Sequence, residues 1–507
     1  MADWNEGYVH DITYTHGFYR ELTPALLNFA LTLSGVESPG LDRPFNYCEL
    51  GSGQGVSANI LAAANPNGQF WATDFNPSHA AGAAQMASAG GLTNLRCLDK
   101  SFQEFLAADT PQFDYITLHG IYSWISPESR QAIVDVIAAK LRVGGVVYIS
   151  YNTLPGWAAA MPLRQLLSDF SDGKEERSER RVEKALAFAD KLREIKAGYF
   201  ADSPKIGQRL DRMKTMSRAY LAHEYLNQYW TPFYFTDVAR ELAAAKLSFA
   251  ASAHVGDHMD NVALPQPAQA LLNEITDPVR RQQARDYVVN QQFRRDVFIK
   301  GAVPINPVQR GAILGATRLA LMKPKDKVSL EVPFPVGVCK LRPEIYNPIL
   351  EQLSTGPKTL GELVQALAPQ KIDQGGIMQA AMVLVGTGDA APALSPQQEA
   401  QRRQQTERFN MALMQRALTS GEVNYLASPV IGSGVPVARL EALMLLAQHR
   451  KADPVRFVWQ AIGSQGIRMM VEGKRLETEE ENLTELAKRY EEFKTERLPL
   501  LNGLGIN

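Results

Sequence analysis

Cysteine is scarce in this chain of 507 residues, which has three in all. Cys48, Cys97 and Cys339 show neither metal-ligand spacing nor the pattern of a disulfide framework. His254-x3-His258 has helical metal-ligand spacing, but Gly256 interrupts the helix and no third soft ligand is near. We therefore expect no metal site, a reducing compartment and a cytoplasmic protein.

Long apolar runs and a strong net charge are also absent. No stretch reaches 18 apolar residues, so we expect no membrane span. Residues 1–6 lack the basic and apolar regions of a secretory signal. A net charge of -1 implies no general attraction to nucleic acid, so we expect no such partner. The length predicts two to four globular domains.

A glycine-rich stretch lies early in the chain. Residues 47–50 read as the end of a buried strand, 51–55 as a turn with three glycines, and 56–64 as a helix of small residues. Glycine accepts a positive φ and lets a ligand approach the backbone closely. The following helix offers unpaired N–H groups and a partial positive charge. This pattern predicts a nucleotide-like site.

The spacing of these glycines indicates which class of ligand the site binds. A dinucleotide-binding loop has its third glycine where Val56 stands, whereas here an acid, Glu49, leads three alternating glycines. An acid at the loop suits a cationic amine, and S-adenosyl-L-methionine (SAM) carries both an amine and a sulfonium. The stretch resembles motif I of class I SAM-dependent methyltransferases. This resemblance implies a SAM site made of Glu49, Gly51, Ser52, Gly53 and Gly55.

A second strand, 69–74, ends in Asp74, nineteen residues after Gly55. A carboxylate one strand–helix–strand unit later can bind both ribose hydroxyls. We expect this role for Asp74, with Phe75 beside it. The alternative is a strand-end turn, which Asn76-Pro77 favours.

Strands alternate with helices over residues 45–151. We expect strands at 45–50, 69–74, 94–98, 113–118 and 146–151, and helices near 55–64, 77–89, 101–108 and 127–141. Residues 142–145 read as a turn before the last strand. Mostly apolar strands in this alternation predict an α/β, doubly wound, Rossmann-like sheet with its site at the carboxyl ends of the strands.

The residues after the last three strands supply further candidates. By the methyltransferase resemblance, Ser101 bonds the adenine amino group and Phe102 packs on the ring; alternatively, Ser101 caps a helix with Glu104. His119 is expected to bind the cofactor or act as a base. An aromatic N-terminal segment is expected to close the site as a lid; alternatively, it covers an edge of the sheet. The candidates for the acceptor side, whose alternative role is core packing, are Tyr14, His119, Tyr122, Trp124, Tyr151, Asn152 and Trp157.

Two signatures narrow the resemblance. Residues 119–124 (HGIYSW) and 150–157 (SYNTLPGW) are similar to those of methyltransferases with a methyltransferase regulatory domain, which include rickettsial-type protein lysine methyltransferases. Residues 223–227, 232–235, 286–288, 292–295 and 426–429 support it. The resemblance implies a protein lysine substrate. A small-molecule methyltransferase and a SAM-binding scaffold without turnover stay open, as does a homodimer.

The predicted layout has mainly helical accessory domains after the catalytic one. We expect a methyltransferase domain at 1–165, a helical connector at 166–218, a regulatory domain at 219–305, a winged-helix-like domain at 306–400 and a helical C-terminal domain at 401–507. The third helical segment of the winged-helix-like domain carries no Lys or Arg at 376–382, which favours protein contact over DNA binding.

Overall fold

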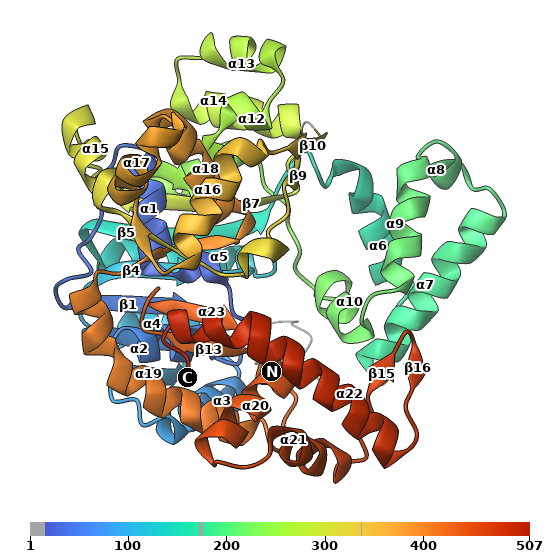
Figure 1. The fold of residues 1–507 in the computed structure, drawn as a ribbon. Helices are drawn as coiled ribbons and strands as arrows, with labels where there is room; N and C mark the ends of the chain where they lie inside the picture. Colours follow the sequence, from blue (N-terminus) through green and yellow to red (C-terminus); the bar gives the residue numbers. More distant parts are fainter. Residues whose placement is uncertain (1–15, 172–175, 336) are drawn as a thin grey trace.

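A seven-stranded sheet forms the centre of the protein (Figure 1). The computed structural model describes residues 16–171, 176–335 and 337–507. The strand order is β3-β2-β1-β4-β5-β7-β6, with β1 to β5 parallel and β7 antiparallel to β5. The strands are β1 (Phe45–Leu50), β2 (Gly68–Asp74), β3 (Leu95–Asp99), β4 (Phe113–Leu118), β5 (Leu141–Asn152), β6 (Leu247–Ser252) and β7 (Phe293–Lys300). The predicted doubly wound, Rossmann-like α/β fold is confirmed.

The strand order reverses between β1 and β4, which pair through Tyr47 and Tyr115. In such sheets a crevice opens outside the carboxyl ends of the strands at this reversal. Glu49 stands at the end of β1, and His119 follows β4 directly. The topology therefore brings these two residues to one edge of the sheet.

Four helices alternate with the parallel strands where the sequence predicts them. They are α2 (Val56–Ala64), α3 (Pro77–Ala89), α4 (Phe102–Ala107) and α5 (Pro127–Lys140). The prediction of a turn at 142–145 is wrong, because β5 begins at Leu141, which pairs with Phe113. An ion pair of 2.6 Å between Arg142 and Asp114 links the two strands beyond that point.

The segment expected to be a regulatory domain contributes strands β6 and β7 to the same sheet. A buried charge network fixes this junction: Arg294 on β7 pairs with Asp296 at 2.8 Å and with Asp286 at 2.6 Å. The helices of the segment are α11 (Phe235–Ala243), η3 (Val255–His258), α12 (Asp260–Ala263), α13 (Gln266–Asn273) and α14 (Pro278–Val289). The catalytic sheet is thus incomplete without residues beyond 240.

Residues 158–171 and 176–225 form a helical arm that stands apart from the rest of the protein in Figure 1. It has a hydrophobic core of its own, with Leu163, Leu186 and Leu210 at its centre and Trp157 at its base. The arm contains η2 (Ala158–Ala160), α6 (Met161–Asp169), α7 (Ser178–Glu194), α8 (Gly198–Ala201), α9 (Pro204–Lys214) and α10 (Arg218–Tyr225).

Residues 307–393 surround a three-stranded antiparallel sheet of order β11-β8-β12. The helices expected at 346–353, 359–367 and 376–384 lie at 343–354, 360–367 and 374–387. Leu26 and Phe29 of α1 (Pro24–Leu33) pack into the core of this region. Its elements are α15 (Pro307–Ala316), β8 (Arg318–Leu321), η4 (Lys325–Lys327), β9 (Glu331–Phe334), β10 (Gly337–Lys340), α16 (Pro343–Ser354), β11 (Lys358–Thr359), α17 (Leu360–Leu367), η5 (Ala368–Gln370), α18 (Gln374–Thr387) and β12 (Ala390–Ala393).

The C-terminal region covers helix α2. Phe409 and Leu426 belong to one hydrophobic core with Ile60 and Leu61 of α2. A helix that is apolar on all sides needs cover on all sides, which explains the run of small residues at 56–64. This region consists of α19 (Pro396–Arg416), β13 (Tyr425–Ser428), β14 (Ser433–Pro436), α20 (Arg439–His449), α21 (Pro454–Gly463), β15 (Met470–Val471), β16 (Lys474–Arg475), α22 (Glu479–Glu492), the π-turn η6 (Phe493–Arg497) and α23 (Leu498–Gly503).

Within the described ranges, no helix is both long and apolar enough to cross a membrane.

Candidate functional site

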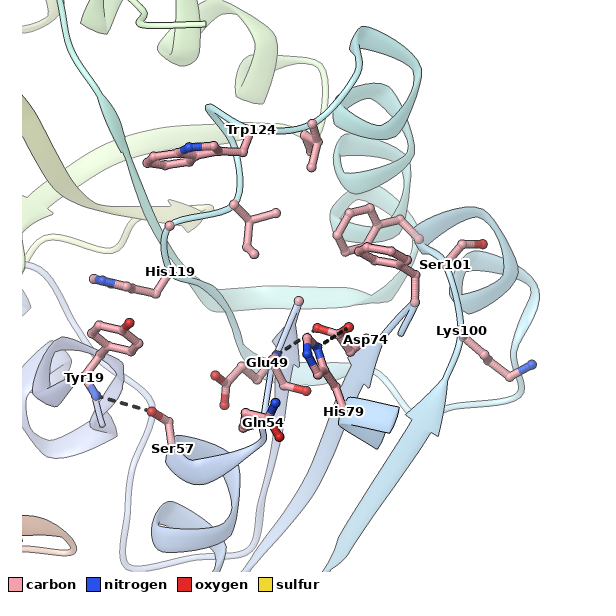
Figure 2. A pocket seen from close by; sticks show the side chains of 18 of the residues that line it. Tyr19, Glu49, Gln54, Ser57, Asp74, His79, Lys100, Ser101, His119 and Trp124 are labelled. Atoms are coloured by element: carbon pink, nitrogen blue, oxygen red, sulfur yellow. Dashed lines mark hydrogen bonds and ion pairs between the residues drawn. The ribbon is translucent and has the colours of Figure 1, made fainter. Parts of the chain in front are cut away.

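A cavity opens at the carboxyl ends of β1, β2 and β4 (Figure 2). The glycine-rich turn forms its floor, and Gly55, at the start of α2, has a φ of +67°. A Cβ atom on Gly55 would lie 2.4 Å from Cβ of Ala83 on α3. Glycine is therefore required here both by backbone conformation and by the close approach of two helices. The cavity lining includes the predicted residues Glu49, Gly51, Ser52, Gly53, Asp74, Phe75, Ser101, Phe102 and His119.

Asp74 holds the turn in place. One of its carboxylate oxygens accepts a hydrogen bond of 2.8 Å from the Gly53 N–H. The other accepts from the Asn76 N–H at 3.0 Å and lies 3.2 Å from Nδ1 of His79. Asp74 is thus fixed at the cavity edge, where each oxygen keeps a lone-pair direction for a ligand hydroxyl. Its ribose role stays a prediction.

Glu49 is a buried carboxyl group that lacks a cationic partner among the described residues. Its side chain is 5 % exposed, and among the described residues its Oε2 atom has no hydrogen-bond partner. Burial, together with the nearby Asp74 carboxylate, raises the pKa of Glu49 to about 8. An orphaned buried carboxyl oxygen costs free energy unless a donor reaches it. A cationic amine fits this position, as the sequence pattern predicts for SAM.

Ser101 and Phe102 lie at the adenine side of the cavity that the resemblance implies. Ser101 also caps α4: its Oγ accepts from the Glu104 N–H at 3.3 Å, and Glu104 accepts from the Ser101 N–H at 2.8 Å. The alternative helix-capping role is therefore present. The adenine contact stays a prediction for the same residue.

His119 and Tyr19 form the wall on the side away from Ser101, with Glu49 between them and Ser101 (Figure 2). Their rings stack with centroids 3.9 Å apart, and His119 Nδ1 lies 2.8 Å from the Tyr148 hydroxyl. Burial lowers the pKa of His119 to about 4, so the imidazole is neutral at pH 7 and a weak base. Tyr14, the residue expected in the lid, lies outside the described residues. Tyr19, from the same aromatic segment, reaches the cavity.

A second cavity of about 620 Å³ adjoins the first. Tyr19, His119, Gly120 and Trp124 line both. Asn152 and Trp157 line the second, as predicted for the acceptor side. The helical arm, to which the sequence assigns no chemistry, supplies much of the remaining wall: Arg209, Arg212, Met213, Met216, Tyr220, His223, Glu224 and Tyr225.

Tyr122 and Tyr151 line neither cavity, which corrects their placement at the acceptor side. Both are fully buried in the core beneath the sheet edge. The Tyr122 hydroxyl donates to Glu241, and the Tyr151 hydroxyl donates to Asp296 at 2.6 Å. Successive side chains of a strand point to opposite faces. Tyr151 therefore faces away from the second cavity when Asn152 faces it.

Sequence reasoning missed several site residues, and His79, Glu224 and Gln54 are three of them. His79 lies in the first turn of α3, and its closeness in sequence to the acid that ends β2 could have indicated it. Glu224 belongs to a stretch, 223–227, used above only as a family signature. Gln54 lines the first cavity within the glycine-rich turn.

The described residues contain no group of three metal-ligating side chains. His258 Nε2 lies 2.8 Å from the Ser252 carbonyl oxygen, and His254 lies 3.5 Å from Asp257. These two histidines therefore stabilise the β6–η3 junction.

Comparison with known proteins agrees with this fold. The model of a "Methyltransferase domain" matches residues 48–147, and that of a "Predicted methyltransferase regulatory domain" matches residues 217–300. A structure of PKMT2 from Rickettsia typhi in complex with AdoHcy superposes with a TM-score of 0.69, covering 97% of this chain and 99% of that chain at 19% identity. Together with the buried Glu49 and the glycine-rich turn, these matches define a SAM-dependent methyltransferase whose cofactor is SAM.

One relative is similar enough over its whole length to show the family of this chain. The chain belongs to the same family as uncharacterized protein sll1526 of Synechocystis, which is 47% identical over 99% of this chain and 100% of that protein. Uncharacterized protein RP789 of Rickettsia prowazekii is 27% identical over 60% of this chain and 54% of its own length.

Proposed function

We propose that the protein transfers a methyl group from SAM to lysine side chains of a protein substrate. The observation that carries this proposal is Glu224, the one carboxylate that lines the second cavity within the described chain. It lies among aromatic side chains, including Trp124, Trp157 and Phe293. An acid within aromatic walls suits a ligand that is an alkyl ammonium. The resemblance to rickettsial-type protein lysine methyltransferases points to the same acceptor.

Methyl transfer to a lysine makes two demands on the second cavity. It must favour the neutral amine, and it must receive the incoming ammonium and its proton. SAM supplies a methyl group on a sulfonium, and the lysine nitrogen must be neutral to attack its carbon. A free lysine has a pKa of about 10.4, so its ammonium must lose a proton first. Desolvation between aromatic rings favours the neutral amine.

Glu224 meets the second demand, which is to receive the ammonium and its proton. Among the described residues, no hydrogen bond or ion pair engages its carboxylate. Burial raises the pKa of Glu224 to about 7, and the positive charge of Arg209 opposes that rise. A carboxylate with this pKa attracts an ammonium and can accept a proton near neutral pH.

The test is transfer of labelled methyl groups from SAM to proteins of a lysate, with methyllysine identified after hydrolysis. Glu224→Gln should lower turnover by about 10- to 100-fold, the equivalent of one charge-assisted bond, with SAM affinity unchanged. The control is Glu194→Gln, which changes an exposed acid on the same arm. Label found in small molecules alone would instead identify a small-molecule methyltransferase, and turnover unaffected by Glu224→Gln would remove Glu224 from the site.

A further inference from the structure

The second cavity is lined by more positive than negative charge. Arg209 and Arg212 on α9 and Arg295 on β7 line it, against the single carboxylate of Glu224. The whole chain is nearly balanced, with 53 Lys and Arg against 54 Asp and Glu. Three guanidinium groups and one carboxylate in one cavity are therefore a local feature rather than a consequence of composition.

Two of these arginines lack the acidic partners that their neighbours have. On the same arm, Lys214 pairs with Asp190 at 2.7 Å, and Arg193 pairs with Asp211 at 2.7 Å. Neither Arg209 nor Arg212 has a carboxylate within 4.0 Å in the described chain. Other cations of the arm, such as Lys205 on the same helix, also lack an ion pair among the described residues, but Arg209 and Arg212 are the unpaired arm cations that line the second cavity.

Aromatic contacts hold two of the guanidinium groups in position. Arg209 lies over the Trp157 ring at 4.1 Å and donates to the Tyr225 hydroxyl at 3.3 Å. Arg295 lies over the Phe293 ring at 5.1 Å, and its Nε is 3.5 Å from Glu21. A guanidinium stacked on a ring loses less freedom when an anion binds its remaining donors.

We propose that the methylated lysine lies in an acidic segment of the substrate protein. In this arrangement Glu224 receives the lysine ammonium, and Arg209, Arg212 and Arg295 receive carboxylates that flank the lysine. Guanidinium groups bind carboxylates through paired, charge-assisted hydrogen bonds. The same three charges repel a lysine in a basic segment, which gives discrimination as well as affinity. This inference rests on the lysine acceptor proposed above.

The experiment uses the full-length protein and synthetic peptides with one lysine each, in which flanking Asp and Glu are replaced by Asn and Gln or by Lys. Binding is measured by fluorescence anisotropy with S-adenosylhomocysteine present, and methylation by labelled SAM. Each flanking carboxylate should strengthen binding about two- to fivefold, the range of a partly exposed ion pair. The gain should shrink as salt rises, because exposed charges are screened.

Arg212→Glu is the decisive variant, because Arg212 is exposed and has no structural partner among the described residues. It should reduce the preference for acidic over neutral peptides by about tenfold, because the charge reversal removes one exposed ion pair and adds a repulsion of similar size. Lys205→Glu makes the same charge change on the same helix at an exposed residue outside the cavity, and should leave the preference intact.

The experiment distinguishes a failure of the acidic-segment inference from a failure of the proposed lysine acceptor. If peptides are methylated on lysine with no dependence on flanking charge, or if both variants behave alike, the acidic-segment inference is wrong and the lysine acceptor stands. If lysine is methylated in no peptide and in no lysate protein, the lysine acceptor itself is wrong and the inference falls with it.

Discussion

Tyr19 stacks on His119 with ring centroids 3.9 Å apart and an angle of 23° between the rings. Both residues line both cavities, so the pair stands at the boundary between the first and the second cavity. The adjacent Arg20 donates to the carbonyl oxygens of Val385 and Gly386, at 2.9 and 2.7 Å. One short segment therefore connects the end of α18 to the site.

Removing the Tyr19 ring should weaken SAM binding. The stack with Tyr19 contributes about 0.5–1.5 kcal/mol beyond its buried area to holding His119 at the cavity wall. Without it, SAM must order His119 on binding, so Tyr19→Ala should lower SAM affinity by up to roughly 10-fold. Tyr19→Phe keeps the stacked ring and should retain more of the affinity than Tyr19→Ala. Titration calorimetry measures both. Equal losses in the two variants would show that the hydroxyl, not the stack, supports the cofactor.

The buried Glu49 should make SAM binding and stability depend on pH in opposite directions. Its pKa of about 8 in the folded protein exceeds the value of about 4.3 for an unfolded chain. Between these values the folded state binds an extra proton, so the stability that wild type has at low pH is lost as pH rises toward 8. Glu49→Gln avoids this loss, and its free energy of unfolding should exceed that of wild type increasingly up to pH 8.

SAM affinity should increase as pH rises, whereas the stability of the folded protein decreases. As pH rises from 6 to 7.5, more Glu49 is ionised, so wild type should bind SAM more tightly; an α-amino group, with a pKa of about 7.7, stays mostly charged there. Glu49→Gln should bind weakly at every pH. Glu37→Gln, at an exposed site, is the control for both measurements. A pH-independent difference in unfolding free energy between Glu49→Gln and wild type would contradict the raised pKa.

The first five strands and the cofactor cavity were predictable because local patterns specify them. Apolar strands, a glycine-rich turn and acids at strand ends lie within a hundred residues of one another. The contribution of β6 and β7 was not predictable, because β7 pairs with β5 from more than a hundred residues away. The opposite facings of Tyr151 and Asn152, by contrast, follow from the alternation of side chains along one strand, so the sequence could have excluded placing both residues at the cavity.

The acceptor cavity was only partly predictable for the same reason. Trp157 and Asn152 follow β5 and were identified from their position in the chain. The arm residues Glu224 and Arg209 reach the cavity through the packing of α9 and α10, which no local pattern encodes. The expected domain boundaries, the homodimer, the absence of a nucleic-acid partner and the cytoplasmic location stay predictions.

Gly55→Ala should destabilise the protein through both its backbone conformation and its contact with Ala83. Gly144, which has a similar φ and no such contact, serves as the control that separates the two effects. Alanine in a left-handed conformation costs about 1–2 kcal/mol. At Gly55 the new Cβ would also lie 2.4 Å from Ala83 Cβ and 3.3 Å from its Cα, and overpacking of this kind costs about 1–3 kcal/mol more. Gly144 has a φ of +76° but no atom within 4 Å of an added Cβ. Chemical denaturation should therefore show a larger loss of unfolding free energy for Gly55→Ala than for Gly144→Ala.

SAM affinity separates the two variants further. To relieve the contact, α3 must move away from α2 in Gly55→Ala, which shifts the glycine-rich turn and the Gly53–Asp74 hydrogen bond with it. Gly55→Ala should then lose SAM affinity even under conditions where it is fully folded. Gly144→Ala should bind SAM normally, because Gly144 lies near the amino-terminal end of β5, whereas the turn follows the carboxyl end of the parallel strand β1. Normal SAM affinity in a folded Gly55→Ala protein would mean that the turn adjusts without help from Gly55, and that the contact with Ala83 sets stability alone.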